Sequence, residues 1–246
     1  MSQQTCYVVF GASGGIGSEL CRMLSVQGAT VVAIGRNETK LSTLGELDGV
    51  QTLICDATNL SEVQQTLLNV EQQVGSIDGV VNCVGSLLLK PAHLTTSDQW
   101  NDIIATNLCT AFNIVHAAAK SMLSTGGSIV LISSAAARIG LPNHEAIAAA
   151  KAGVIGLTLS AAATYASRGI RVNCVAPGLV QTPMTNSLTS SEIALNASKK
   201  MHPIGRIGQP ADISSSIVWL LDPMRSWLTG QVIGIDGGLA TLRGRS

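Results

Sequence analysis

The chain has 246 residues, with 15 basic and 15 acidic side chains that cancel to a formal net charge of zero at pH 7. Such a chain has no electrostatic footprint for nucleic acid or for an anionic membrane, so neither is expected as a partner. Aromatic residues make up only 3% of the chain, and small aliphatic residues and glycine dominate, which favours helices packed closely on a sheet.

Strand-like apolar runs alternate with helical stretches along the chain. The expected strands are TCYVVF, ATVVAIG, VQTLIC, IDGVVNCV, GSIVLIS, GIRVNCVAP and GQVIGID. Their apolar residues are continuous and do not alternate with polar ones, which indicates a parallel sheet covered by helices on both faces. The sequence therefore predicts one α/β domain over residues 1–246, with a doubly wound parallel sheet of about seven strands.

One irregular stretch, residues 182–208, follows the sixth predicted strand and contains a short possible helix, SSEIALNASKK. A long excursion at the carboxyl edge of a parallel sheet is where a lid is expected. The sequence therefore predicts a substrate lid at residues 182–208.

Two uncharged runs, residues 103–119 and 152–167, resemble membrane spans at first sight. Both are short for a span and are interrupted by Asn, Thr, Ser or Gly. Helices that are apolar nearly all round are more often buried in a core or a subunit interface. We expect interface helices here and no membrane.

The N-terminus and the cysteines favour a reducing, cytoplasmic location. The first segment, MSQQTCYVVFGASGG, has no basic region before its apolar run, so a signal peptide is not expected. No two cysteines form a Cys-x-x-Cys pair, so we expect small buried residues and no metal site. The six are Cys6, Cys21, Cys55, Cys83, Cys109 and Cys174.

A glycine-rich turn, VVFGASGGIGSEL, joins the first predicted strand to the first predicted helix. Gly11, Gly15 and Gly17 permit a tight turn and let backbone N–H groups approach a pyrophosphate at the helix N-terminus. Such a turn alone could be a simple strand-to-helix connection. Because it opens the first unit of a doubly wound pattern, it predicts the dinucleotide site of a Rossmann fold.

The end of the second predicted strand, AIGRN, indicates which dinucleotide binds. An NAD site usually has Asp or Glu here to bind the ribose 2′-hydroxyl. This chain has Arg36 and Asn37, and an arginine can pair with a 2′-phosphate through its guanidinium fork. The sequence therefore predicts NADP(H), with Glu38, just beyond, as the one nearby carboxylate that argues for NAD.

Further segments resemble motifs of the short-chain dehydrogenase/reductase family, and the resemblance covers nearly the whole chain. CDAT is similar to the segment whose aspartate faces the adenine, NCVG to the NNAG motif beside the cofactor, and TNLCTAF to the segment with the relay asparagine. VLISS is similar to the segment with the catalytic serine, and RVNCVAPGLVQTPM to the one that holds the nicotinamide. The predicted cofactor-binding residues are Gly11, Ser13, Gly15, Ile16, Gly17, Arg36, Asn37, Asp56, Ala57, Asn82, Gly85, Lys151, Pro177, Gly178, Val180 and Thr182.

The resemblance implies an oxidoreductase that transfers hydride between nicotinamide and a carbonyl carbon, and it implies a homotetramer. In the family, a serine holds the carbonyl oxygen, a tyrosine supplies the proton, and a lysine binds the nicotinamide ribose and lowers the pKa of the tyrosine. The family's tyrosine lies thirteen residues after the serine and four before the lysine. Counted from Ser134 and from Lys151, that position is Ile147. Tyr7 lies in the first strand and Tyr165 about 21 Å further along the same helix, at roughly 1.5 Å per residue, so neither replaces it.

Three accounts of the missing tyrosine remain open. In the first, His144 donates the proton: it lies seven residues before Lys151, a spacing similar to that of the enoyl reductases, a divergent branch of the family. With Asn143 as N-cap, His144 would lie in the first helical turn, on the face of Ile147 and Lys151. In the second account, water or Ser134 suffices. In the third, the protein is a dinucleotide-binding sensor or assembly subunit without catalysis. The predicted catalytic residues are Ser134, Lys151, Asn107 and His144.

The substrate class rests on residue type alone. An apolar lining favours a small apolar carbonyl or enone compound, and its expected members are Leu141, Ile147, Leu179 and Met184. Three more histidines are not counted as catalytic residues. His93 is expected in a loop and His116 packed within an apolar helix. His202 closes the lid, where it could touch substrate.

Overall fold

A computed structural model of the protein describes residues 5–243. Seven strands form one sheet in the order β3-β2-β1-β4-β5-β6-β7, and all neighbouring pairs are parallel. The strands are β1 Cys6–Phe10, β2 Thr30–Gly35, β3 Val50–Ile54, β4 Gly79–Asn82, β5 Gly127–Ile132, β6 Ile170–Pro177 and β7 Val232–Ile235. The predicted Rossmann fold with a doubly wound, seven-stranded parallel sheet is confirmed. Residues 1–4 and 244–246 of the predicted domain lie outside the described range.

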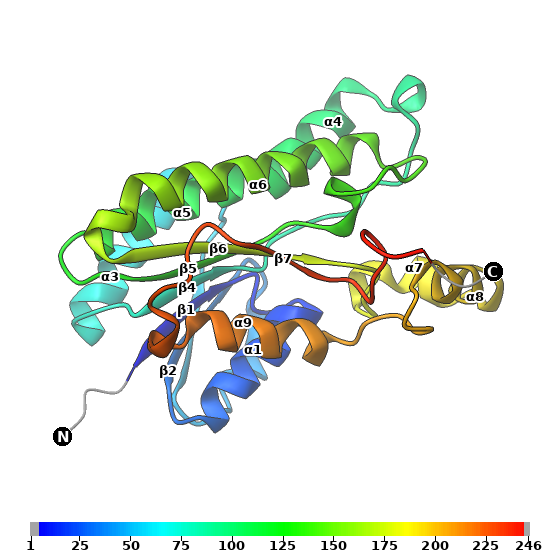
Figure 1. Ribbon diagram of the computed structural model, residues 1–246. Coiled ribbons are helices and arrows are strands. Elements are labelled where there is room, and N and C mark those ends of the chain that lie inside the picture. The colour runs from blue at the N-terminus through cyan, green and yellow to red at the C-terminus, as the bar shows by residue number, and fades with distance from the viewer. Residues whose placement is uncertain (1–4, 244–246) are drawn as a thin grey trace.

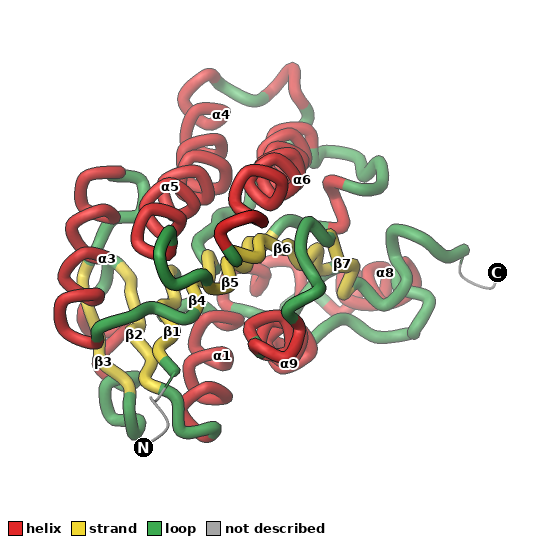
Figure 2. The backbone as a smooth tube through the Cα atoms, turned by 60° about the vertical axis from the view of Figure 1, so that its left-hand side comes forward, coloured by secondary structure: helices red, strands yellow, loops and turns green. Residues whose placement is uncertain are grey.

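Helices cover both faces of the sheet (Figure 1). They are α1 Gly15–Val26, α2 Glu38–Ser42, α3 Leu60–Val74, α4 Ser97–Ile104, α5 Thr110–Met122, α6 Glu145–Tyr165, α7 Asn186–Thr189, α8 Glu192–Met201 and α9 Pro210–Leu221. Helices α3, α5 and α6 lie on one face, and α1 and α9 on the other (Figure 2). Side chains of β1 alternate between them, so that Val8 and Phe10 pack under the first group and Tyr7 and Val9 under the second. Two packed layers of helix thus enclose the strands, which explains their continuous apolar runs.

Helices α4 and α5 are joined without a break by a π-helical turn, η2 (Ala105–Cys109). A capping box of Thr96 and Gln99 fixes the start of α4. A π turn inserts an extra residue into the helix and is frequent at functional sites. Here it contains Asn107, whose side chain it buries beside the end of β4. The sequence pattern predicted a helix over this region but gave no sign of the π turn.

The two uncharged runs fall in η2 with α5 and in α6. Most side chains of α5 are buried within the chain, whereas α6 packs along β6 and exposes Ala152, Gly156 and Leu159 on its outer side. Residues 145–168 form the one helix, among residues 5–243, that is long and apolar enough to cross a membrane. Its inner side lies on the sheet, as in the core helix of a globular domain.

The cysteines are only partly as predicted. Cys6, Cys21, Cys55 and Cys174 are buried, and burial raises the pKa of Cys6 and of Cys174 to about 11. Cys83 is half-buried. The expectation is wrong for Cys109, which is exposed because it lies on the outer side of the η2 turn, while the inner side carries Asn107.

The irregular stretch after β6 contains the 3₁₀ turn η5 (Pro183–Thr185), α7 and α8. Its ends meet: Val180 and Gly208 form a parallel β-bridge, in which the Gln181 N–H donates to the Gly208 carbonyl over 2.9 Å. Neither α7 nor α8 has a buried residue. Residues 182–208 are therefore an excursion with a closed base and with little attachment to the core.

Candidate functional site

Most of the predicted site residues follow the carboxyl ends of β1 to β6, which lie at one edge of the parallel sheet. The turn after β1 consists of glycines because a side chain at these positions would collide with neighbouring atoms. Gly11 has φ +73°, and a Cβ on it would lie 2.7 Å from the carbonyl carbon of Cys83. A Cβ on Gly17 would collide with the carbonyl oxygen of Gly11. Helix α1 begins with no side-chain cap and no acidic residue in its first turn, so its N–H groups are available to an anion such as a pyrophosphate.

The segment after β6 lies against this turn. A Cβ on Gly15 would lie 2.8 Å from Cγ2 of Thr182, so only glycine permits this contact. The Thr182 N–H donates to Oγ1 of Thr185 over 3.0 Å, and Val180 is buried. Pro177 and Gly178, at the end of β6, pair with Ile235 of β7. The structure thus brings together two predicted cofactor segments that are about 165 residues apart in the sequence, a separation that the parallel sheet topology closes.

The remaining turn residues have specific neighbours. Oγ of Ser13 lies 3.4 Å from the Cβ position of Gly35, so the turn lies beside the end of β2. Ile16 packs in the core between α1 and α9, and its carbonyl oxygen accepts a hydrogen bond from Ser214. The side chain and the carbonyl of Ile16 are therefore engaged within the protein, and its role in cofactor binding stays a prediction for the backbone N–H.

Arg36 lies at the end of β2, with its guanidinium 3.9 Å from the carboxylate of Asp56. Its side chain is 69% exposed, so the guanidinium can turn toward a ligand. A hydrogen bond from the Thr58 backbone N–H, more than the charge of Arg36, lowers the pKa of Asp56. Asn37 caps α2, and Oδ1 accepts from the Lys40 N–H over 2.9 Å, so that oxygen is already occupied.

Ala57 and Asn82 hold the neighbouring backbone in place. Ala57 is buried, and its carbonyl oxygen accepts from the Asn113 side chain over 3.0 Å. Asn82 is buried at the end of β4, where Oδ1 accepts from the Val84 N–H over 2.9 Å. These contacts fix the backbone just after β3 and β4, and the binding of a dinucleotide by either residue stays a prediction.

A polar cluster forms where Gly85, Asn107 and Lys151 converge. A Cβ on Gly85 would lie 3.1 Å from Oδ1 of Asn107, 3.6 Å from Nζ of Lys151 and 4.0 Å from Cε of Met184. The Asn107 side chain exchanges hydrogen bonds with Ser86: Oδ1 accepts from the Ser86 N–H, and Nδ2 donates to Ser86 Oγ over 3.0 Å. Three predicted residues from β4, η2 and α6 are therefore brought together.

Lys151 is held at both ends by β5. Its ammonium donates to the Ile132 carbonyl over 2.9 Å, and its own carbonyl accepts from Oγ of Ser133 over 2.8 Å. Burial lowers the pKa of Lys151 to about 8, while the thiols of Cys174 and Cys83 act weakly in the opposite direction. The lysine is therefore both positioned and easily deprotonated, two properties typical of a functional ammonium group.

Ser134 lies at the end of β5 and is half-buried, with its Oγ accepting from the Ala136 N–H over 3.1 Å. Within residues 5–243 its hydroxyl proton has no acceptor, so it can bind an oxygen of a ligand. The sequence reasoning missed two supporting serines: Ser133, which anchors the backbone of Lys151, and Ser86, which holds Asn107. Both stand next to motif residues, and only the distances in three dimensions reveal their partners.

The start of α6 differs from the prediction. Asn143 is not the N-cap: it has φ +64°, a left-handed conformation that asparagine tolerates, and His144 takes the cap position with no capping hydrogen bond. Nδ1 of His144 lies 2.7 Å from the Pro142 carbonyl oxygen, its one side-chain hydrogen bond within residues 5–243. Since a carbonyl only accepts, Nδ1 carries the proton, and Nε2 of the neutral ring has none to donate. His144 therefore lies outside the first helical turn, and its catalytic role stays a prediction.

Ile147 is only 4% exposed and packs in an apolar cluster with Ile103, Leu87 and Leu88. It therefore offers almost no surface to a substrate. Of the other expected lining residues, Leu141 and Leu179 are half-buried, and Met184 is half-exposed beside Gly85.

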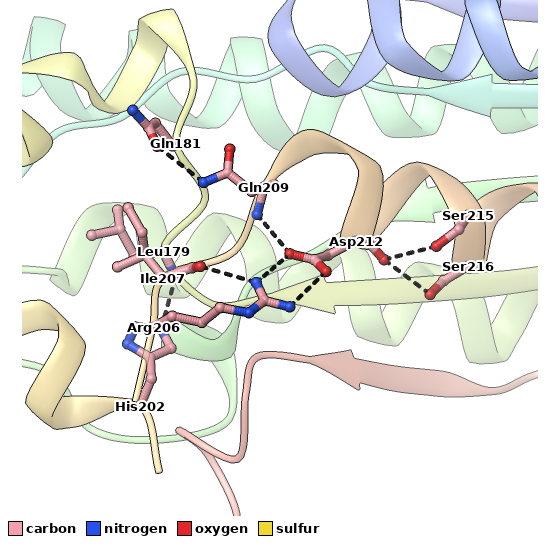
Figure 3. Close-up of polar contacts among 9 residues, drawn as sticks. All are labelled: Leu179, Gln181, His202, Arg206, Ile207, Gln209, Asp212, Ser215 and Ser216. Carbon is pink, nitrogen blue, oxygen red and sulfur yellow. Dashed lines mark hydrogen bonds and ion pairs between the residues drawn. The ribbon is translucent and has the colours of Figure 1, made fainter. Parts of the chain in front are cut away.

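The base of the excursion is tied together by polar contacts (Figure 3). Arg206 and Asp212 form a two-pronged ion pair with distances of 2.6 and 2.8 Å. His202 is buried, where Nε2 accepts from the Leu179 N–H over 3.1 Å and Nδ1 donates to the Ser198 carbonyl. His202 thus links α8 to the end of β6 and does not face a substrate, contrary to the expectation.

The structure also shows the surroundings of the two other histidines, His116 and His93. His116 is exposed and not packed: it contacts Gln64 of α3 over 3.0 Å and lies beside the ring of Phe112. The apolar character of α5 comes from its inner side, and His116 lies on the outer one. His93 lies exposed in a 3₁₀ turn between β4 and α4. Within residues 5–243, no group of three or more His, Cys, Asp or Glu side chains is placed to hold a metal ion.

The chain matches the family model described as Enoyl-(Acyl carrier protein) reductase over residues 11–240. It is 35% identical over 235 residues to the 3-oxoacyl-[acyl-carrier-protein] reductase FabG of Vibrio harveyi, an alignment that covers 94% of this chain and 96% of the relative. It is 37% identical over 242 residues to carbonyl reductase family member 4 of Danio rerio, with 96% and 98% covered.

Solved structures agree with these relatives. A short-chain type dehydrogenase/reductase from Mycobacterium ulcerans superimposes with a TM-score of 0.92 at 31% identity, over 99% of this chain and 93% of that one. A variant of actinorhodin polyketide ketoreductase with NADPH gives 0.92 at 29% identity, over 98% and 99%. ElxO with NADP bound gives 0.91 at 27% identity, over 97% and 100%. The fold and the relatives are those of a family of oxidoreductases. The chain belongs to the short-chain dehydrogenase/reductase family.

Proposed function

We propose that the protein transfers hydride between NADP(H) and a small apolar carbonyl or enone compound. The observation that carries the proposal is the polar cluster of Gly85, Asn107 and Lys151, which lies beside the glycine turn and beside the segment of Ser134. Bound NADP(H) would supply or accept the hydride. Ser134 would bind the carbonyl oxygen, and Lys151 would hold the ribose of the nicotinamide. The names of the two curated relatives also describe carbonyl reductases.

The preference for NADP(H) rests on the end of β2. Arg36 is exposed there, and no acidic residue occupies positions 35–37. A guanidinium can bind a 2′-phosphate through two parallel hydrogen bonds, whereas a carboxylate would repel it. Two of the solved neighbours hold NADPH or NADP, which supports the same form of cofactor here.

The proton donor is unusual in this proposal, since Ile147 occupies the position at which the family motif has tyrosine. The sequence offers His144 or a water molecule in its place. We also propose that residues 182–208 close over the substrate, and that the chain acts as a cytoplasmic homotetramer.

The test is a screen of carbonyl and enone compounds for oxidation of NADPH, with Ile147→Tyr beside the wild type. A tyrosine would stand four residues before a lysine already in place, so carbonyl reduction should rise about 10²-fold, at the lower end of general acid catalysis. Ile147→Phe is the matched control, because it adds the ring without the hydroxyl and should give no gain.

The same experiment separates the alternatives. His144→Ala should lower kcat about 10²-fold, with NADPH affinity nearly unchanged, if this histidine is the donor. If the wild type binds NADPH tightly, no compound in the screen is reduced and Ile147→Tyr gains nothing, the protein is a dinucleotide sensor or scaffold and the proposal fails.

A further inference from the structure

The ammonium of Lys151 belongs to the polar cluster at the carboxyl edge of the sheet. Its Nζ lies 3.6 Å from the Cβ position of Gly85, next to Asn107. One N–H donates to the Ile132 carbonyl, and residues 5–243 provide no acceptor for the other two. These two N–H groups are therefore free for a ligand or for one bridging water.

Neither the residue at the motif's tyrosine position, nor His144, nor either tyrosine of the described chain is placed to compete with it. Ile147 is aliphatic and packed in its apolar cluster. The hydrogen bond from Nδ1 of His144 to the Pro142 carbonyl leaves Nε2 of the neutral ring without a proton to donate. Tyr7 is buried in β1, and Tyr165 ends α6 fourteen residues beyond Lys151.

The surroundings of Lys151 suit an acid that works near neutral pH. Among residues 5–243, the titratable groups that act on it are the thiols of Cys174 on β6 and Cys83 on the β4 side, and no carboxylate is among them. Burial therefore dominates and lowers the pKa of the ammonium to about 8. A general acid is most effective when its pKa is close to the working pH. A lysine paired with a carboxylate would instead hold its proton too tightly.

We propose that Lys151 is the proton donor of this enzyme, beyond any role in holding the cofactor. The inference rests on the proposed carbonyl reduction. The carbonyl carbon receives hydride from the reduced nicotinamide dinucleotide, its C=O π bond breaks, and the oxygen takes a proton from Nζ directly or through one water. The products are the alcohol, the oxidised dinucleotide and a neutral amine on Lys151, which regains its proton from solvent.

The kinetic test compares the wild type with Lys151→Arg, whose guanidinium keeps the charge but does not release a proton. Because the acid must be protonated, wild-type kcat should fall as the pH rises through about 8. Lys151→Arg should lose 10²-fold or more in kcat and this pH dependence, while Kd for NADPH, measured by fluorescence titration, changes only a few-fold. Lys120→Arg, on the exposed side of α5, is the matched control and should change nothing.

A second measurement needs no turnover. The chain has six lysines, so ¹³Cε-labelled lysine gives six NMR signals, and the one missing in Lys151→Arg is that of Lys151. In the wild type this signal should titrate near pH 8.

Titration above pH 10, a level kcat between pH 7 and 10, or full activity of Lys151→Arg would each overturn the proposal. An active wild type with an equally active Lys151→Arg refutes only the role of Lys151, whereas a wild type that reduces no carbonyl compound refutes the proposed function as well. Should Lys151→Arg fail to fold, as judged by circular dichroism, the wild-type titration and pH profile still decide.

Discussion

Arg36 shows how a single side chain can set cofactor choice at little cost to the fold. Its ion pair with Asp56 is long, at 3.9 Å, and both partners are exposed. Exposed ion pairs contribute about 0–1 kcal/mol, so turning the guanidinium from the carboxylate toward a 2′-phosphate costs little. A two-pronged, charge-assisted contact with the phosphate is worth more, about 1.5–3 kcal/mol.

We therefore expect NADPH to bind at least about tenfold more tightly than NADH, since 1.4 kcal/mol corresponds to a factor of ten. Arg36→Asp should abolish or reverse this preference, because a carboxylate repels the phosphate and can bind a ribose 2′-hydroxyl. The measurement is a titration of both proteins with both cofactors. Arg22→Asp, an exposed arginine on α1, should leave the preference unchanged. Equal affinities in the wild type would refute the assignment of NADP(H).

At this scale, the sequence reveals residues whose identity is forced by backbone geometry. Gly11 and Gly17 could be predicted because any Cβ there meets main-chain atoms. The position of His144 could not be predicted. The left-handed φ of Asn143 moves the helix start by one residue, and no sequence pattern indicates this shift. Ser86 and Ser133 were missed for a related reason: their roles depend on partners 21 and 18 residues away.

At the scale of elements, residues 182–208 have a firm base and loosely attached helices. The β-bridge between Val180 and Gly208 and the ion pair of Arg206 with Asp212 close the base (Figure 3). Helices α7 and α8 bury no residue, so they are expected to open more easily than the sheet. The excursion could be predicted from its missing apolar periodicity. The attachment of this segment through the hydrogen bonds of His202 could not be predicted, because a histidine at the end of a polar helix has no distinctive sequence pattern.

His202→Phe tests this attachment. The change leaves the partly buried N–H of Leu179 without its acceptor, at a cost of about 1–3 kcal/mol. Amide hydrogen exchange should show roughly tenfold weaker protection at residues 179–204, with the protection of β1, β4 and β5 unchanged. His93→Phe, at an exposed position, is the control. Equal loss of protection throughout the sheet would mean that His202 stabilises the whole domain and not this segment.

At the scale of the whole molecule, the outer side of α6 is unusual for a surface helix. Between residues 146 and 164 its one charged side chain is Lys151, which is buried. Leu159 is 49% exposed, and a Cβ added at Gly156 would meet no atom within 4 Å. Helix α5 adds Phe112, which is also half-exposed. An exposed apolar face without charges is typical of a surface that another subunit covers, and its small residues would let two helices approach closely.

We therefore expect a homotetramer at micromolar concentration, with α6 in an interface between subunits. Leu159→Glu would place an unpaired carboxylate in that interface, at a cost of about 3–5 kcal/mol, which corresponds to a 10²-fold or greater rise in the dissociation constant. Analytical ultracentrifugation should then show smaller species. Leu68→Glu is the matched control: Leu68 is 46% exposed on α3, outside the apolar face, and its variant should sediment like the wild type. A wild type that sediments as a monomer, or a Leu159→Glu variant that associates as fully as the wild type, would contradict the predicted interface. In the second case, the remaining apolar surfaces would have to hold the tetramer.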